Sequence, residues 1–422
     1  MTAPAPTLTL IHTSDWHLGH ELAGHAREAE HAAFLSWLLD EIDRQDADVL
    51  LVTGDIFDVA NPPVSATRRL YGFLAEVAAR RPAMLTVILG GNHDSAARID
   101  LPAPLLDPTK VHFVGRLPRR TLTDDGAQSI GTAPDLEGLM IPLRGADGTA
   151  AAWLAAVPFC RPGDLGAHSL TTLYAEVISH ASAQAGDLPL VLSGHLHVAG
   201  GAVSELSERR IVVGGEEAQA AELFGTAPSY VALGHLHRAQ DVPGACPIRY
   251  AGSPFPLSAT ERDYRHSISV VRLAPGRPAD IAEVEIPRVV PFLAVPESGA
   301  APLDVVVAQL TALDLDETLP PDAYPFIEVS VAVEGPEPHL QAQVLAALAD
   351  KPVRLTRIVR QTIAHTGEAT NPLAARDLDE LRPDAVFAAL HATRHGGHPP
   401  SDDLAQAFAR LLVEVNTVGE DG

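Results

Sequence analysis

Side chains that can bind metal ions follow successive apolar runs of this chain within a residue or two. In chain order they are Asp15, His17, Asp55, Asn92, His93, His195, His235 and His237. Carboxylate, amide and imidazole ligands suit Mn²⁺, Fe or Zn²⁺ and not soft metals. Two such cations, held about 3.5–4 Å apart by a bridging carboxylate, can clamp a phosphate ester and activate water for in-line attack. The pattern therefore predicts a two-metal phosphoesterase centre.

The runs that must position these side chains are short and strongly apolar. They are "LTLIHTSD", "DVLLVTGD", "MLTVILGGNHD", "LPLVLSGHLH", "YVALGHLHRA" and "IRYAGSP". Near-continuous Val, Ile and Leu predicts strands that are buried on both faces. The stretch "REAEHAAFLSWLLDEIDRQ" between the first two runs has apolar residues at helical spacing, so an α/β layered fold is expected. Because ligands bind beyond the carboxyl ends of strands in such folds, we expect the polar side chains to gather at one edge.

The domain organisation follows from length and from changes of pattern along the chain. A chain of 422 residues predicts two or three domains, the first over 1–287. After Pro287, strand-like and helix-like segments alternate and predict a small α+β domain over 288–370. Two amphipathic stretches split by "HGGHPP" predict a helical pair over 371–422, which either packs on its own domain or docks a partner. The Gly-, Asp- and Pro-rich stretch 124–148 is expected to be a long surface loop or an irregular insert.

Charge and composition exclude several kinds of site. The formal charge of −24 argues against a general electrostatic grip on nucleic acid, although bound cations would reverse the sign locally. Lysine occurs only at Lys110 and Lys351, neither preceded by glycine, so this chain has no P-loop and no ATP site. The two cysteines, Cys160 and Cys246, form no C-x-x-C pattern, so neither a disulfide framework nor a thiolate zinc site is indicated. No apolar run is long enough to span a membrane and the N-terminus lacks signal-peptide features, so we expect a cytoplasmic protein without a membrane partner.

The order D-x-H, G-D, G-N-H-D, G-H and G-H-x-H resembles the signature of the calcineurin-like metallophosphoesterases. Longer stretches, among them "HTSDWHLG", "GDIFDVANPP", "GGNHDSAARI" and "RYAGSPFPLS", resemble the SbcD family of bacterial nuclease subunits over most of the chain. The resemblance implies an α/β metallophosphoesterase β-sandwich flanked by helices. It also implies a small α+β capping domain that binds DNA and a C-terminal helical pair.

The resemblance also divides the candidate ligands between two cations and makes Asp55 the bridge between them. The two sets are Asp15, His17 and His237 for one cation, and Asn92, His195 and His235 for the other. The two Gly-His-Leu-His copies are then two strand ends at one centre and not a repeat unit. His197, in the first copy, is not expected to be a ligand.

Two further residues receive a catalytic role by the same resemblance. His93 would contact the scissile phosphate and protonate or steady the leaving oxygen. Asp58, three residues after the bridging carboxylate, would orient His93.

The activity implied by the resemblance is that of a Mn²⁺-dependent DNA nuclease in DNA repair, recombination and replication. It would be an ATP-assisted 3′→5′ exonuclease on double strands and an endonuclease on hairpins. An SbcC-type ATPase subunit would supply the ATP step in a heterotetramer, with the helical tail as its docking element. The family also implies a homodimer and a place beside the nucleoid.

Arginines are the candidates for contacts with DNA, since guanidinium groups match phosphate geometry. One candidate track consists of Arg68, Arg69, Arg116, Arg119, Arg120 and Arg238, and a second consists of Arg354, Arg357 and Arg360. The stretch "YAGSPFPLS" either lays backbone amides near the substrate or forms a plain tight turn. Solvated surface charges are the ordinary alternative for the arginines.

Two other functions compete with the nuclease. A metallophosphoesterase for small molecules would share the whole metal site, but it would not need the additional domain and tail. A catalytically silent scaffold would be expected to lose metal ligands or the histidine of G-N-H-D, and all of these residues are present.

Overall fold

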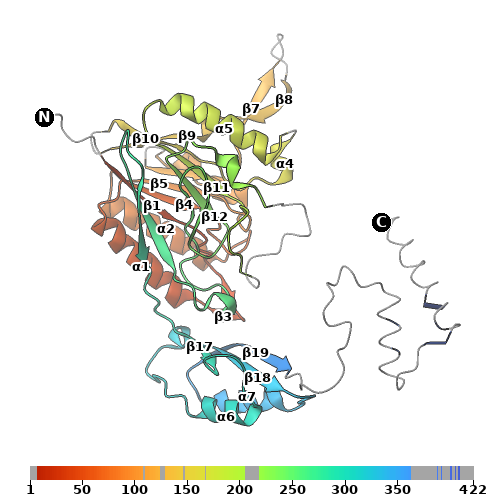
Figure 1. Ribbon diagram of the computed structural model, residues 1–422. Coiled ribbons are helices and arrows are strands. Elements are labelled where there is room, and N and C mark those ends of the chain that lie inside the picture. Colours follow the sequence, from red (N-terminus) through yellow and green to blue (C-terminus); the bar gives the residue numbers. More distant parts are fainter. Residues whose placement is uncertain are drawn as a thin grey trace. The chain divides into compact units, whose positions relative to one another are not determined.

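The computed structural model describes residues 7–362, apart from 108–109, 124–128, 146–147, 167 and 205–217, together with a few single positions between 387 and 408. Within Met1–Gln361, two six-stranded sheets and one three-stranded sheet hold most of the strands (Figure 1).

The first sheet combines four strands from residues 8–114 with two strands from residues 267–285. Its order is β16 (Asp280–Glu285), β15 (Ser267–Leu273), β1 (Leu8–Thr13), β4 (Val49–Thr53), β5 (Leu85–Leu89) and β6 (Val111–Val114). Strands β1, β4, β5 and β6 are parallel, whereas β15 and β16 run antiparallel to their neighbours. The first three apolar runs of the sequence are therefore β1, β4 and β5, as predicted.

The second sheet contains the other predicted runs. Its order is β13 (Gln240–Val242), β14 (Ile248–Tyr250), β12 (Tyr230–Gly234), β11 (Leu190–His195), β10 (Ala150–Ala155) and β9 (Met140–Arg144). Strands β10, β11, β12 and β14 are parallel, and β9 and β13 are antiparallel at the two edges.

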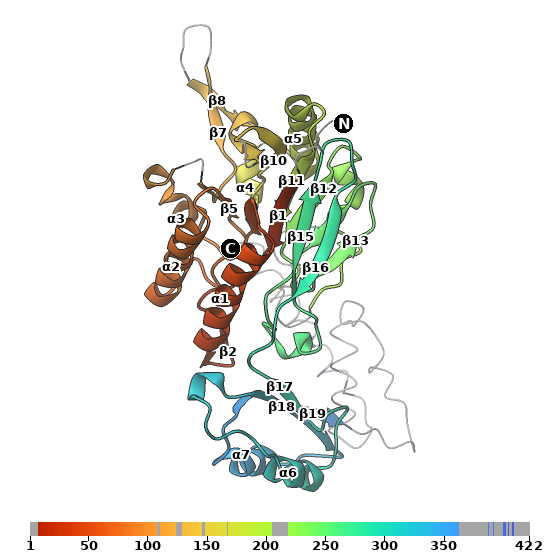
Figure 2. The same cartoon turned by 90° about the vertical axis from the view of Figure 1, so that its left-hand side faces the viewer.

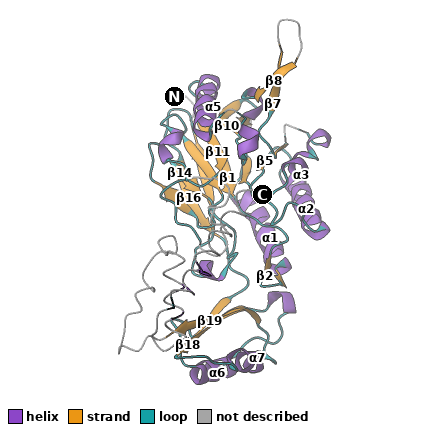
Figure 3. Cartoon of the chain, turned by 90° about the vertical axis from the view of Figure 1, so that its right-hand side faces the viewer, coloured by secondary structure: helices purple, strands orange, loops and turns teal. Residues whose placement is uncertain are grey.

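The two sheets share an apolar core, and helices cover their outer faces. Leu10 and Leu51 of the first sheet lie in this core with Leu154 of the second. On the other face of β4, Leu50 and Val52 pack beneath α1 (Glu28–Arg44) and α2 (Val64–Arg80), while α5 (Leu170–Ala185) covers the second sheet. Strands buried on both faces explain the continuous apolar runs. The predicted β-sandwich flanked by helices is confirmed (Figures 2 and 3).

Short elements connect the main strands. They are β2 (Glu21–Leu22), β3 (His25–Ala26), α3 (Ala96–Asp100), β7 (Arg119–Thr123), β8 (Ser129–Pro134) and α4 (Pro162–Leu165). Strands β7 and β8 pair as an antiparallel ribbon. The expected loop over 124–148 is thus wrong for β8 and β9. Strand β8 has polar residues that face water, and the short apolar run of β9 lies between Gly and Asp residues. Neither strand therefore shows the apolar pattern that predicts a buried strand.

The residues after Pro287 form a β-α-β-α-β unit of their own. Its elements are β17 (Phe292–Val295), α6 (Leu303–Thr311), β18 (Phe326–Val333), α7 (Leu340–Leu348) and β19 (Arg354–Thr362). Val306 and Val344 of the helices pack on Val329 of the central strand in a separate core. The predicted alternation of strands and helices is confirmed, whereas the boundaries at 288 and 370 stay predictions.

Arginine side chains join this small unit to the sandwich. Arg27, which is 1% exposed, donates from Nε to Glu30 at 2.7 Å, and its guanidinium lies 5.3 Å from the ring centroid of Phe326. Arg354 lies 3.8 Å from the same centroid and donates to the carbonyl of Ala26 at 2.9 Å. Arg354 therefore has a structural role between the two units, and a contact between it and DNA would compete with that role.

The predicted helical pair over 371–422 lies outside the described residues except at single positions. Phe387 of the first stretch and Phe408 of the second are described, and their rings stack with centroids 4.1 Å apart. One described residue of each amphipathic stretch thus contacts the other through its aromatic ring.

Candidate metal centre

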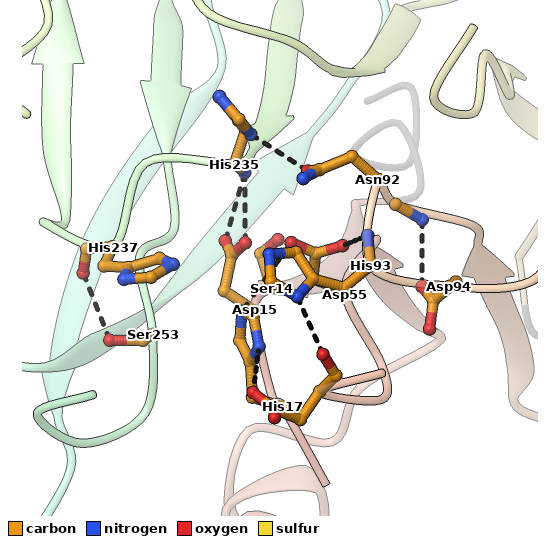
Figure 4. A network of polar contacts seen from close by, with 12 residues as sticks. Ser14, Asp15, His17, Asp55, Asn92, His93, Asp94, His235, His237 and Ser253 are labelled. Carbon is orange, nitrogen blue, oxygen red and sulfur yellow. Dashed lines mark hydrogen bonds and ion pairs between the residues drawn. The ribbon is translucent and has the colours of Figure 1, made fainter. Parts of the chain in front are cut away.

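Both sheets deliver candidate ligands to the same edge of the sandwich (Figure 4). From the first sheet, Asp15 and His17 follow β1, and Asp55 follows β4. Asn92 comes three residues after β5. From the second sheet, His195 closes β11, while His235 and His237 follow β12. The predicted gathering of polar side chains beyond the carboxyl ends of the strands is therefore present in the structure.

Four of these residues have a backbone conformation that L-amino acids rarely adopt. Their φ angles are positive: Asp15 (53°), His17 (43°), Asp55 (48°) and His235 (104°). Such conformations cost about 1–3 kcal/mol each and persist where the surrounding structure holds them. Strained backbone tends to cluster at functional sites, and here it clusters at four candidate ligands.

The glycines before the ligands allow close packing more than sharp turns. Only Gly54 among them has a positive φ, at 98°. A Cβ atom on Gly91 would collide with the Asp55 carboxylate, and one on Gly234 would collide with the carbonyl of Thr53. At Gly91 and Gly234 the lack of a side chain, and not a left-handed turn, is therefore what matters.

The candidate ligand atoms form two overlapping groups, and a third group joins His17 to Asp58 and His93. One oxygen or nitrogen from each of Asp15, His17 and His237 lies within 4.8 Å of the other two. The same holds for Asp15, Asp55 and His195. Distances of this order suit a cation bound between the atoms.

Asn92 extends the second group with an amide oxygen. Its Oδ1 lies 2.8 Å from Nε2 of His195 and 3.1 Å from Nδ1 of His235. Nε2 of His195 is also 3.4 Å from the Asp55 carboxylate. Asp55 therefore lies within reach of both groups.

The donor set fits divalent cations of intermediate hardness. Two buried carboxylates, an amide oxygen and four buried imidazoles match the ligands of Mn²⁺, Fe or Zn²⁺. Nε2 of His17 is buried without a hydrogen-bond partner, and its nearest carboxylate oxygen, on Asp55, is 3.6 Å away. A buried polar atom without a partner is costly unless an ion completes it.

Burial and neighbouring charges set the protonation of the ligands. Burial raises the pKa of Asp15. Burial opposes ionisation of Asp55 as well, but His195, His17 and His93 together outweigh it and hold the pKa of Asp55 well below its usual range. Burial lowers the pKa of His235 to about 3, so this imidazole is neutral, which is the form that binds a metal.

Comparisons with known proteins agree with this geometry. A family model described as calcineurin-like phosphoesterase matches residues 8–239, more than half of the chain. A second model, described as type 5 capsule protein repressor C-terminal domain, matches residues 288–395. The chain is 39% identical over 398 residues to the SbcD subunit of the nuclease SbcCD from Rhodobacter capsulatus, with 90% of this chain and 94% of that protein covered.

This chain belongs to the SbcD family of calcineurin-like phosphoesterases. It is 30% identical over 397 residues to the SbcD subunit of the nuclease SbcCD from Escherichia coli K12, with 90% of this chain and 92% of that protein covered. The predicted family is confirmed, and so is the predicted enzyme class, a metal-dependent phosphoesterase of the nuclease type. Protein TT1561 of Thermus thermophilus shares 14% identity over 67% of this chain and all of its own, with a TM-score of 0.35 that carries no weight.

His93 and Asp58 lie beside the candidate ligands. Nδ1 of His93 lies 2.7 Å from the backbone carbonyl of Asp58, to which it donates. The carboxylate of Asp58 instead contacts Nδ1 of His17 at 3.2 Å. In this structure the backbone of Asp58 therefore orients His93, and its side chain supports a different imidazole.

Two further carboxylates of the site were not singled out from the sequence. Asp94 is buried and accepts hydrogen bonds from the amides of Gly91, Ile56 and Phe57 at 2.9 to 3.1 Å. Glu261 is fully buried and accepts from Nδ1 of His237 at 2.9 Å. Asp94 closes the G-N-H-D segment, so the sequence held a signal for it. Glu261 lies 24 residues after its histidine, and no local pattern points to it.

The remaining predicted residues are His197 and the arginines considered for contact with DNA. His197 is half-buried, and its ring centroid is 6.4 Å from that of His235. Arg69, Arg116 and Arg119 bond to groups of the protein itself, whereas Arg238 is exposed with its guanidinium 5.7 Å from the ring of Tyr264. Arg68 and Arg120 are exposed.

Among the described residues, no helix is both long and apolar enough to cross a membrane.

Proposed function

We propose that this chain cleaves DNA as a Mn²⁺-dependent nuclease, as a 3′→5′ exonuclease on double strands and an endonuclease on hairpins. The main support is the convergence of buried carboxylates and imidazoles at one edge of the sandwich, in a chain 39% identical over 398 residues to a protein named as a nuclease subunit. The proposed process is DNA repair, recombination and replication.

Two half-sites are proposed, which share Asp55 as the bridge. The first half-site is Asp15, His17 and His237, and the second half-site is Asn92, His195 and His235. In support, the first three offer atoms within 4.8 Å of one another, and Asn92 Oδ1 lies within 3.1 Å of both imidazoles of its set. Cations bound there would neutralise charge on a phosphate and lower the pKa of the attacking water.

His93 is proposed to act on the leaving oxygen. Its Nδ1–H is committed to the carbonyl of Asp58, so only Nε2 remains for the substrate. Burial lowers the pKa of His93, so the free imidazole is mainly neutral. A DNA phosphate beside the ring would favour the imidazolium form, because an opposite charge stabilises it. In that form Nε2 donates a proton to the leaving oxygen or stabilises its negative charge.

An SbcC-type ATPase is the proposed partner, in a heterotetramer in the cytoplasm beside the nucleoid, with two copies of this chain. The relatives that are matched over more than nine tenths of their own length carry the name of the SbcD subunit of SbcCD. The tail, residues 371–422, is proposed as the docking element. Deleting residues 373–422 is expected to abolish SbcC binding in a pull-down and to leave Mn²⁺-dependent cleavage intact.

The experiment compares DNA with a small phosphodiester. An end-labelled hairpin, a linear duplex and a nitrophenyl phosphodiester are incubated with the chain in Mn²⁺, with and without the ATPase. We expect wild type to cut both DNA substrates and His93→Leu to lose this cutting while keeping its bound metal. Turnover of the small diester with DNA untouched, with the ATPase present, would instead support an enzyme for small molecules.

A further inference from the structure

The imidazoles of the two half-sites are supported from behind by different groups. In the first half-site, Nδ1 of His17 contacts the Asp58 carboxylate at 3.2 Å, and Nδ1 of His237 contacts the Glu261 carboxylate at 2.9 Å. In the second half-site, Nδ1 of His195 donates to the backbone carbonyl of Thr53 at 2.8 Å. A carboxylate behind an imidazole makes it a stronger metal ligand than a neutral carbonyl does.

Burial of the Glu261 carboxylate is energetically unfavourable, so its contacts must offset that free energy. Its side chain is fully buried, and a buried carboxylate is unfavourable unless its oxygens find partners. One oxygen faces His237, and the other accepts from the amide of Leu257 at 2.7 Å. The segment 251–261, which contains most of the "YAGSPFPLS" stretch, thus holds Glu261 behind a candidate ligand. This segment is more than the plain turn that was its alternative.

The charges near the two half-sites differ in the same direction. The first half-site contains the Asp15 carboxylate, which also lies within 4.8 Å of His195, and two more carboxylates that stand behind the imidazoles of the first half-site only. The second half-site has the neutral amide of Asn92 and a carbonyl. Asp55 is common to both, and the buried Asp94 is committed to three backbone amides and contacts no ligand imidazole among the described hydrogen bonds. A divalent cation therefore meets more negative charge in the first half-site.

Resting on the ligand sets proposed above, we propose that Asp58 and Glu261 are positioning residues that make the first half-site the tighter of the two. The chain then takes up two divalent cations in order. The first half-site fills at low concentration, and the second half-site fills only at higher concentration. The dependence of cleavage on Mn²⁺ concentration follows the second step, because both cations are needed to clamp the phosphate.

The test is a titration of the metal-free full chain with Mn²⁺, with free Mn²⁺ followed by its electron paramagnetic resonance signal. Wild type is expected to bind two ions in steps whose Kd values differ by at least about tenfold. Asp58→Asn and Glu261→Gln are each expected to weaken the first step by about 10- to 100-fold and to leave the second nearly unchanged. Asn92→Ala is expected to weaken only the second step.

Controls separate charge from folding. Glu76→Gln changes a carboxylate on α2 that is 63% exposed and is expected to change neither step. Because Glu261 also holds the amide of Leu257, its variant is checked by thermal melting of the metal-free chain. Asp58, which is 26% exposed, carries the test if that variant unfolds.

Two outcomes would overturn the proposal. Equal Kd values for both ions in wild type would do so, and so would an unchanged first step in Asp58→Asn. Failure of the proposed metal centre looks different, because wild type would then bind fewer than two ions.

Discussion

The two sheets supply different chemistry to one edge of the molecule. The first sheet contributes the carboxylates Asp15 and Asp55 with the amide of Asn92, whereas the second sheet contributes imidazoles alone among the candidate ligands. His17 adds one imidazole to the oxygens of the first sheet. Neither sheet alone therefore holds a complete ligand set. The site exists only where the two sheets pack, so the shared core and not any local motif creates it.

The largest expected effect comes from the carboxylate at the junction. Asp55→Asn removes the charge that both half-sites share, and cleavage of duplex and hairpin DNA should fall by at least about a thousandfold. Bound Mn²⁺, measured by elemental analysis after desalting, should fall below two ions per chain. Asp187→Asn, an exposed control, should leave both values unchanged. Full metal content in Asp55→Asn would contradict the bridging assignment.

The second sheet offers a matched pair within one tetrapeptide. His195→Gln should lower cleavage by about a hundredfold, because it removes a buried imidazole of the second half-site. His197→Gln, two residues away and half-buried, should change cleavage by less than about threefold, as substitutions away from the reacting groups usually do. The comparison is made with initial rates on the hairpin substrate. Equal losses in both variants would mean that His197 belongs to the site.

Close packing at the edge can be disturbed without removing a ligand. Gly91→Ala should lower the free energy of unfolding by about 3 kcal/mol, because its Cβ collides with the Asp55 carboxylate. Gly72→Ala, in α2 with open space around it, should raise stability by about 0.5–1 kcal/mol. Urea unfolding of the metal-free proteins measures both. A stable Gly91→Ala protein with normal metal binding would refute the close-approach account.

His12 tests the contact between the sheets through pH. It lies between Tyr230 of the second sheet, 2.8 Å from Nδ1, and Thr53 of the first, 3.0 Å from Nε2. Burial lowers its pKa to about 3, with the charge of Arg249 a smaller cause. Protonation thus favours the unfolded chain, so the stabilising contribution is complete above pH 6.5 and is lost as pH falls towards 3.

The slope of stability against pH is the observable. This group contributes up to about 1.4 kcal/mol per pH unit below pH 6.5. His12→Gln should be less stable at pH 7 and should lose stability less steeply between pH 6.5 and 5. His180→Gln, on α5 with 34% of its side chain exposed, serves as the control. An unchanged slope in His12→Gln would show that other groups control the acid response.

Much of the fold and most candidate ligands could be predicted because strands and the residues that follow them leave local signals, although the site itself forms only where the sheets pack. Strands such as β1, β4 and β12 are buried on both faces, so their apolar runs stand out, and the side chains that follow them are visible at once. The β-α-β-α-β order of the small unit was predicted for the same reason.

The parts that escaped prediction depend on contacts between distant segments. Glu261 meets His237 across 24 residues, and Asp58 turned out to face His17 with its carboxylate. Arg354 looks like a surface charge in sequence but packs on Phe326. The roles of Gly91 and Gly234 also follow from neighbours that only the packed sheets bring near. Spacing along one chain carries no information on such partners.

The most direct test of the central claim is a crystal structure of the full chain soaked in Mn²⁺, with anomalous scattering used to locate the metal. Two peaks are expected, one on either side of the Asp55 carboxylate. One peak should be coordinated by Asp15, His17 and His237, and the other by Asn92, His195 and His235. A single peak, or metal bound away from the junction of the two sheets, would contradict the account.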